Sequence, residues 1–307
     1  HSECVQQLLA ANAAVDQAAT DGATPLFMAC QEGHSECVQQ LLAANAAVDR
    51  ATKVKITPLM ISCDAGHDEC VQLLLSANAA VDGATKISTT PLIVACDKGH
   101  TECVQVLLAA NAAVDQTEPL WGVTPLFVAC REGHIKCAQL LSCYRAERFW
   151  PAHHEGEPWT AMQVSEHYGH DDLHKWLEQS RNWSPLHHLE VLTLARARAL
   201  LRSEAIALRL QTGGSGADSA SPLDRAEQHM QRTPSGDGAV MTQVAKLLMC
   251  AAGPWSPASH ELFSDSHRRQ AALLVPLLYH VFHRFCGGAG WQAVDFVHAI
   301  LSKMFYR

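Results

Sequence analysis

Apolar positions recur in one fixed pattern along the first half of the chain. In the copy that begins at Thr24-Pro25, an apolar run leads to Gly33-His34, and a segment of the form Cys-Val-x-x-Leu-Leu follows. The spacing of this second segment places its apolar residues on one face of a helix. Because Thr is a good N-cap and Pro suits the first helical position, the Thr-Pro pair predicts a helix start. The pattern therefore predicts pairs of short helices separated by a glycine turn.

The pattern is also periodic. It returns at Thr57, Thr90 and Thr124, and in a worn form at Thr160, with steps of 33, 33, 34 and 36 residues. A fixed period near 33 residues with a Thr-Pro-Leu opening is the signature of a helical repeat array.

Two positions in each copy predict a left-handed backbone. A glycine ends the first helix, where such a conformation is needed; these residues are Gly33, Gly66, Gly99 and Gly133. After the second helix comes an asparagine, which adopts positive φ more readily than most residues; these residues are Asn45, Asn78 and Asn111.

At these positions the sequence resembles the ankyrin repeat family, since the period and the motif positions agree in four consecutive copies. The four copies cover residues 21–150, a partial copy covers 1–20, and divergent copies extend to about residue 252. The resemblance implies an all-α helical repeat solenoid with short hairpin tips. It also implies that the chain binds a partner and does not catalyse a reaction.

The pattern divides the chain into three parts. Residues 1–180 are expected to form the repeat array, and 181–252 divergent or capping repeats that include the Gly/Ser-rich loop 211–219. Beyond 253 the period is lost, and residues 253–307 are expected to form a helical C-terminal module with helices near 266–285 and 290–304. Because residues 1–9 copy 34–42, residue 1 falls inside a repeat, and we expect the chain to be a piece of a longer protein.

The overall charge excludes some classes of partner. The formal net charge of the 307-residue chain is −8, which argues against non-specific binding to nucleic acid or a membrane surface. No apolar run approaches the roughly 18–20 residues that a membrane-spanning helix needs. We therefore expect a monomer that binds a protein, with no nucleic-acid partner and no membrane insertion.

Most of the 12 cysteines recur at the same two positions of each repeat, for example Cys30 and Cys37. The resemblance implies small apolar residues there, so these cysteines are interpreted as small buried hydrophobes in reduced form. Reduced cysteines favour an intracellular location, in the cytoplasm or the nucleus.

The same residues offer a metal pattern, Cys30-x3-His34-x2-Cys37, which has ligands of the zinc type. Each repeat supplies only three such ligands, and the resemblance implies that the His hydrogen-bonds loop backbone, so no metal and no cofactor are predicted. Phosphate-binding, dinucleotide-binding, zinc-protease and nucleophile-elbow motifs are absent from the sequence. The chain is therefore predicted not to be an enzyme, with a Cys/His metal-binding or enzymatic protein as the alternative of another class.

The resemblance implies a concave binding face, formed by the hairpin tips and the solvent side of the first helices, which we name the first-helix face. Its apolar stripe among charges suits a protein partner. The predicted partner-binding residues are Met28, Gln31, Glu32, Arg50, Lys53, Lys55, Ile61, Asp64, Lys86, Val94, Asp97, Lys98, Glu118, Trp121, Val128, Arg131 and Glu132.

Trp121 is the sharpest candidate, because Trp at an interface often contributes much of the binding energy. Its alternative role is packing against the extra residue of that longer repeat. The sequence also departs from the family motif at the position that usually holds His, where Phe27, Met60, Ile93 and Phe127 stand. Apolar stacking between neighbouring repeats is expected to replace the contacts of that His.

The prediction for function is a non-catalytic interaction scaffold that binds a protein partner through the first-helix face. The alternative is a substrate receptor of a ubiquitin-ligase-type assembly, in which residues 253–307 dock the larger assembly. It is motivated by the tail that abandons the repeat pattern, although no convincing SOCS-box or F-box phrase occurs there.

Overall fold

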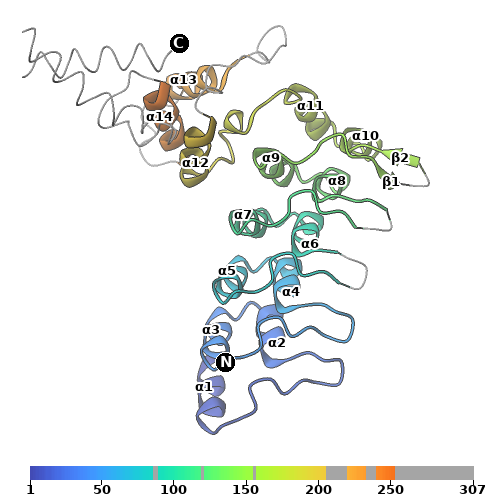
Figure 1. The fold of residues 1–307 in the computed structure, drawn as a ribbon, viewed down its shortest axis with the longest axis vertical. Helices are drawn as coiled ribbons and strands as arrows, with labels where there is room; N and C mark the ends of the chain where they lie inside the picture. Colours follow the sequence, from blue (N-terminus) through green and yellow to red (C-terminus); the bar gives the residue numbers. More distant parts are fainter. Residues whose placement is uncertain (86–88, 119–120, 155–156, 205–219, 233–239, 253–307) are drawn as a thin grey trace, which may run out of the picture. The chain divides into compact units, whose positions relative to one another are not determined.

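The computed structural model describes residues 1–85, 89–118, 121–154, 157–204, 220–232 and 240–252 (Figure 1). The chain forms two compact units, His1–Arg181 and a second unit that begins at Asn182. The expected C-terminal module 253–307 and the Gly/Ser-rich loop 211–219 lie outside the described residues.

The first unit consists of short helices in pairs, preceded by α1 (Ser2–Ala10). The first helices of the pairs are α2 (Pro25–Gln31), α4 (Pro58–Ala65), α6 (Pro91–Lys98), α8 (Pro125–Arg131) and α10 (Ala161–His167). The second helices are α3 (Ser35–Ala43), α5 (Asp68–Ser76), α7 (Thr101–Ala109), α9 (Ile135–Cys143) and α11 (Asp171–Gln179). First helices pack on one another in one row, and α1, α3, α5, α7 and α9 pack in a second row (Figure 1). This two-row stack confirms the predicted all-α helical repeat solenoid.

The threonine that opens each repeat caps the first helix, as the sequence predicts. Thr24 Oγ1 accepts a hydrogen bond from the Phe27 backbone N–H at 3.2 Å. Thr57, Thr90 and Thr124 repeat this bond at 3.1 to 3.3 Å. Such a cap satisfies one of the helix donors that has no partner within the helix.

The predicted left-handed positions are also confirmed. The glycines at the ends of the first helices have φ of 70° to 78°, and Asn45, Asn78 and Asn111 have φ of 60° to 63°. Arg145 has φ 66° at the equivalent position of the fifth copy, although the sequence there no longer matches. The backbone of that repeat therefore follows the array where its side chains depart from it.

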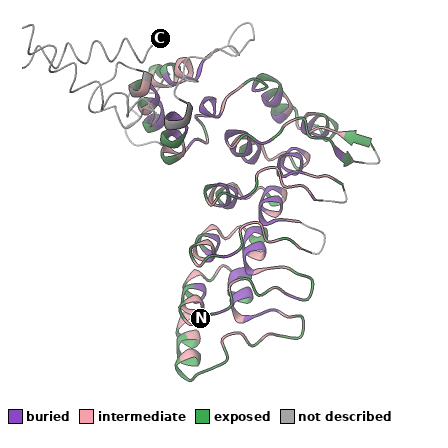
Figure 2. Cartoon of the chain, in the orientation of Figure 1, coloured by how far each residue is buried: buried purple, intermediate pink, exposed green. Residues whose placement is uncertain are grey.

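The core lies between the two rows of helices, whereas the connecting loops are mostly exposed or half-buried (Figure 2). Leu26, Leu59, Leu92 and Leu126 are fully buried, as are many of the repeated cysteines. The described cysteines from Cys4 to Cys143 are unpaired thiols, and Cys4 alone among them is exposed, so the interpretation as buried hydrophobes is confirmed. The four apolar residues at the family's His position are buried as well, with exposed fractions of at most 7%.

One tip contains strands that the sequence did not predict. Between α9 and α10, β1 (Ala152–His154) pairs antiparallel with β2 (Glu157–Trp159). Each strand has only three residues, which is too short for a period-two pattern to be visible.

The second unit contains a short 3-10 turn, η1 (Pro185–His187), followed by α12 (Leu194–Glu204), α13 (Pro222–Arg232) and α14 (Val240–Ala252). Both α12 and α13 pack against α14. The Ser184-Pro185-Leu186-His187 opening forms a reciprocal cap, in which the Ser184 backbone N–H donates to His187 Nδ1 at 2.9 Å. At the position where a repeat has its first helix, this segment therefore forms a single 3-10 turn.

Candidate functional site

The first helices are held in register by contacts between the Gly-His pairs of neighbouring repeats. Each His ring lies against the glycine of the preceding repeat, so closely that a Cβ added at Gly66 would lie 2.6 Å from the ring of His100. The same close approach pairs Gly33 with His67, Gly99 with His134 and Gly133 with His170. These glycines are therefore required by the neighbouring repeat as well as by their own positive φ.

Each of these histidines also bonds the backbone of the preceding first helix. His100 Nε2 lies 3.2 Å from the Asp64 carbonyl oxygen, and His134 Nε2 lies 3.2 Å from that of Asp97. His67 and His170 repeat the bond at 3.2 and 2.8 Å. Because a carbonyl oxygen only accepts, Nε2 carries the proton in each case. We name these Gly-His contacts the histidine ladder.

A second ladder runs along the loops that follow the second helices. Asp82 Oδ1 accepts the backbone N–H of Ala113 at 3.0 Å, one repeat further on. Asp16, Asp49 and Asp115 make the same bond to Ala47, Ala80 and Glu147 at 2.9 to 3.0 Å. We name these bonds the aspartate ladder. Asp49, Asp82 and Asp115 recur at one position of the repeat, after which the sequences of the copies differ.

The tips are closed at positions that are 33 residues apart. The backbone N–H groups of Ala19, Thr52, Thr85 and Glu118 donate to the carbonyl that precedes each capping threonine. Thr52 and Thr85 also accept a backbone N–H of their own tip through Oγ1, at 3.2 and 3.1 Å.

Glu118 changes the chemistry of this position in the fourth tip. Its Oε2 accepts the Trp121 backbone N–H at 3.0 Å, and its side chain is buried, with 8% exposed. The Trp121 carbonyl in turn accepts the His153 backbone N–H at 2.7 Å. The backbone of Trp121 is thus bonded on both sides, while its side chain is 54% exposed.

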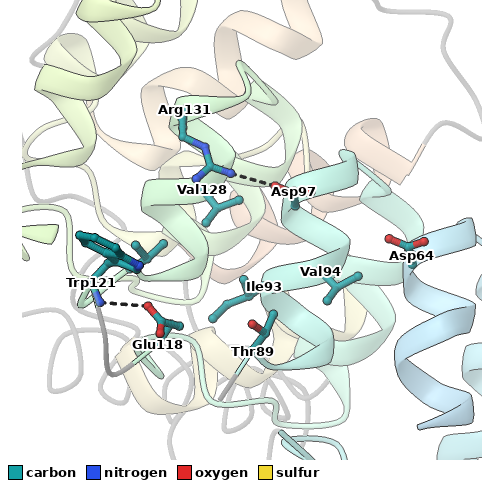
Figure 3. Close-up of a pocket in the computed structure, with 10 residues that line it drawn as sticks. Asp64, Thr89, Ile93, Val94, Asp97, Glu118, Trp121, Val128 and Arg131 are labelled. Atoms are coloured by element: carbon teal, nitrogen blue, oxygen red, sulfur yellow. Dashed lines mark hydrogen bonds and ion pairs between the residues drawn. The ribbon is translucent and has the colours of Figure 1, made fainter. Parts of the chain in front are cut away.

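A pocket of about 340 Å³ opens beside this tip. Figure 3 shows Trp121 at one side and Asp64 at the other, with Ile93, Val94 and Val128 between them. The lining residues come from α4, α6, α8 and the third and fourth tips: Asp64, Thr89, Ile93, Val94, Asp97, Glu118, Trp121, Val123, Val128 and Arg131. Most of them belong to the predicted partner-binding set; Thr89, Ile93 and Val123 do not.

A chain of ion pairs crosses the helices beside the pocket. Arg131 Nη2 lies 2.9 Å from Asp97 Oδ1, and its Nε lies 2.6 Å from Glu132 Oε1. Lys98 Nζ lies 3.0 Å from Asp97 Oδ2 and 3.9 Å from Asp64 Oδ1. These side chains are a third to a half exposed, so each pair contributes little to stability. Their effect is to hold these charged side chains in defined positions on the first-helix face.

The structure places the remaining predicted residues on the same helices and loops. Met28, Gln31, Glu32, Arg50, Lys53, Lys55, Lys98 and Glu132 are exposed. The apolar stripe is uneven: Met28 is 46% exposed, Ile61 and Val94 are half-buried, and Val128 is buried at 3%. Lys86 lies outside the described residues.

Three lining residues, Thr89, Ile93 and Val123, are not among the residues predicted from the sequence to bind a partner. Ile93 stands at the position of the family's loop-bridging His and is 6% exposed, yet it borders the pocket. Thr89 and Val123 immediately precede capping threonines. Their place at the end of each tip, one residue before the helix start, is the signal that could have found them.

The buried cysteines have no features of reactive thiols. Burial raises the pKa of Cys30, Cys103 and Cys130 to about 12, so they are protonated at neutral pH. Within the described ranges, no three His, Cys, Asp or Glu side chains converge where they could hold a metal ion. The pair His170/His174 bonds backbone instead, because His174 Nδ1 lies 3.3 Å from the Met162 carbonyl oxygen.

The family model for ankyrin repeats, described as three copies, matches residues 1–85 and 81–148. No curated protein matches the chain. Among the helices that the structure describes, none is long and apolar enough to cross a membrane.

Proposed function

Residues 1–148 of this chain belong to the ankyrin repeat family, and from that premise we propose that the chain is a non-catalytic scaffold that binds a protein partner. Ankyrin repeats are generally protein–protein interaction modules and are typically non-catalytic. The binding surface in this proposal is the first-helix face, from Met28 to Glu132.

The observation that carries the proposal is the half-exposed indole of Trp121, beside a pocket on the first-helix face. Its backbone is bonded to Glu118 and His153, so the ring is presented from a fixed point of the loop. A Trp that is 54% exposed leaves a large apolar surface in water. Partner contact would cover it, and such rigid aromatic anchors often dominate protein interfaces. This supports the interface role of Trp121 over the packing role.

The chemistry of the repeat core agrees with a binding protein. The thiols that recur in each repeat are buried among Leu and Val side chains and have raised pKa values. A thiol is a nucleophile only as thiolate, so these positions offer no activated nucleophile. The substrate-receptor alternative depends on residues 253–307, outside the described residues, and stays a prediction.

Affinity capture tests the proposal. The tagged chain is incubated with an extract of cells that express it, and captured proteins are quantified by mass spectrometry. We expect at least one protein to be retained by the wild type and lost with Met28→Glu or Trp121→Ala. Gln72→Glu, an exposed site on α5 in the other row of helices, is the control and should retain it. Captured proteins that respond equally to all three variants would contradict binding through the first-helix face.

A further inference from the structure

The fourth tip differs from the other tips in one chemical respect. At the position where the second and third tips have Thr52 and Thr85, it has Glu118, and it is one residue longer before the capping threonine. The carboxylate of Glu118 lines the pocket. Thr52 and Thr85 accept the N–H of the residue before the capping threonine, whereas Glu118 accepts the Trp121 N–H. The fourth tip thus carries a charge at a position that is neutral in the first three tips.

The pocket is acidic. Its lining includes the carboxylates of Asp64, Asp97 and Glu118 and a single cationic group, Arg131, a formal balance of −2. Lys98, which pairs with two of the carboxylates from just outside the lining, reduces the balance only to −1. Carboxylates in a recess with low-dielectric walls attract cations more strongly than they would on an open surface.

The rest of the lining suits the stem and the head of a long cationic side chain. Ile93, Val94, Val123 and Val128 provide an apolar lining along which methylene groups can lie. Trp121 presents a ring at one side of the pocket (Figure 3), and indole is the best aromatic partner for a cation. A planar guanidinium can stack on that ring and donate to a carboxylate at the same time.

We propose that this pocket receives a basic side chain, arginine in preference to lysine, from an extended segment of the protein partner. The inference rests on the proposed function, since it names the residue that the first-helix face selects. The guanidinium lies between the Trp121 ring and the carboxylate of Glu118, and the stem lies on Val94 and Val128. Asp64 adds negative charge at the opposite side of the pocket.

Selection from a displayed library of short random peptides tests the inference. The immobilised full chain is the bait, and peptides that no longer bind Trp121→Ala are kept. We expect the kept peptides to share an Arg. Replacing this Arg by citrulline, which has the same shape without the charge, should weaken binding on the order of tenfold or more. Replacement by Lys should weaken it less.

Neutral variants of the chain locate the effect in the pocket. In the double variant Asp64→Asn and Glu118→Gln, the ratio of the affinities of the Arg and citrulline peptides should fall to less than about threefold. The matched control is Glu36→Gln with Glu69→Gln, which changes the net charge equally at exposed sites on α3 and α5 and should keep the full difference. Asp64→Asn alone should give an intermediate ratio. Because the Asp64 side chain is exposed and makes no hydrogen bond within a tip, this variant remains informative if the Glu118 variant destabilises the fourth tip.

The outcomes separate the two proposals. Peptides that need Trp121 but bind equally well with citrulline, or that share an acidic residue instead, overturn the basic-residue inference and leave the proposed function intact. If no peptide depends on any residue of the first-helix face, both proposals fail. An equal loss of Arg preference in the pocket variant and in the matched control would show a whole-molecule charge effect and also overturn the inference.

Discussion

The repeated frame (the Thr caps and the two ladders) and the fourth tip, at Glu118, Trp121 and Val123, belong to one array but differ in what their side chains do. In the frame, Thr caps, the histidine ladder and the aspartate ladder recur with nearly constant distances from repeat to repeat. In the tip, Glu118 and Trp121 occur once, and both face a pocket. The difference teaches that polar residues which recur in every repeat hold neighbouring repeats together, whereas residues that occur in one repeat only form the pocket.

Alkaline pH should cause the largest loss of folding stability, because it acts on thiols that are buried in the core of the repeats. Cys30, Cys103 and Cys130 keep their protons in the folded chain up to about pH 12, because burial raises their pKa. In the unfolded chain the same thiols lose their protons above a pH of about 8.5 to 9. Stability is therefore fully present below that pH and falls as the pH rises, by about 1.4 kcal/mol per pH unit for each buried thiol.

Urea unfolding under reducing conditions, followed by circular dichroism between about pH 9 and 11, measures this slope. Cys130→Ala should lower the slope by about 1.4 kcal/mol per pH unit, the contribution of one thiol. Cys4→Ala removes an exposed cysteine and should leave the slope as it is. Equal slopes in wild type and Cys130→Ala would contradict a buried, protonated thiol at this position.

The histidine ladder should be the next most sensitive feature. In Gly99→Ala the new Cβ would lie 2.5 Å from the ring of His134, at a φ of 72° that alanine disfavours. Backbone strain of about 1–2 kcal/mol and a steric clash of about 1–3 kcal/mol should both lower the free energy of unfolding. Thermal and urea unfolding measure the loss.

Gly169 provides the matched control for that substitution. It has the same φ of 72° at the end of α10, but nothing lies within 4 Å of an added Cβ. Gly169→Ala should therefore cost only the backbone strain, about 1–2 kcal/mol. If the two variants lose the same stability, the His134 ring does not approach Gly99 as closely as the structure shows.

The aspartate ladder should contribute less, because its bonds are near the surface. Asp82→Ala leaves the Ala113 N–H without its acceptor and should cost about 1 kcal/mol. Asp82→Asn keeps an oxygen acceptor at the same place and should restore about half of the loss or more. Equal destabilisation by Ala and Asn in urea unfolding would show that the charge matters and the hydrogen bond does not.

The sequence allows the frame to be predicted because the signals are local. Thr24-Pro25 specifies a helix start, and Gly66 or Asn78 specifies a left-handed residue, without knowledge of any neighbour. The aspartate ladder could not be predicted in this way, because Asp82 meets Ala113 only through the register between two repeats. Arg145 shows the converse: its positive φ is imposed by the stack, and its own side chain gives no signal for it.

The candidate site could be predicted only as a set of separate residues. Asp64, Val94, Glu118 and Trp121 each follow from a position in the motif. Their meeting in one pocket depends on how three repeats stack and on the length of the fourth tip. The role of Glu118 as a buried acceptor for the Trp121 N–H has no sequence signal, because a glutamate in a loop ordinarily faces water.

Trp121→Ala should have the smallest effect on stability and yet a large effect on binding. Its ring is 54% exposed, and its bonds to Glu118 and His153 are made by backbone atoms that alanine retains. The free energy of unfolding should therefore stay within about 0.5 kcal/mol of wild type, while affinity for a captured partner falls roughly tenfold or more. Leu8, 59% exposed on α1 in the other row of helices, is the matched site, and Leu8→Ala should change neither quantity. If Trp121→Ala loses stability in proportion to binding, Trp121 packs within the repeat and stabilises it. The distinction between the frame and the tip would then not hold for this residue.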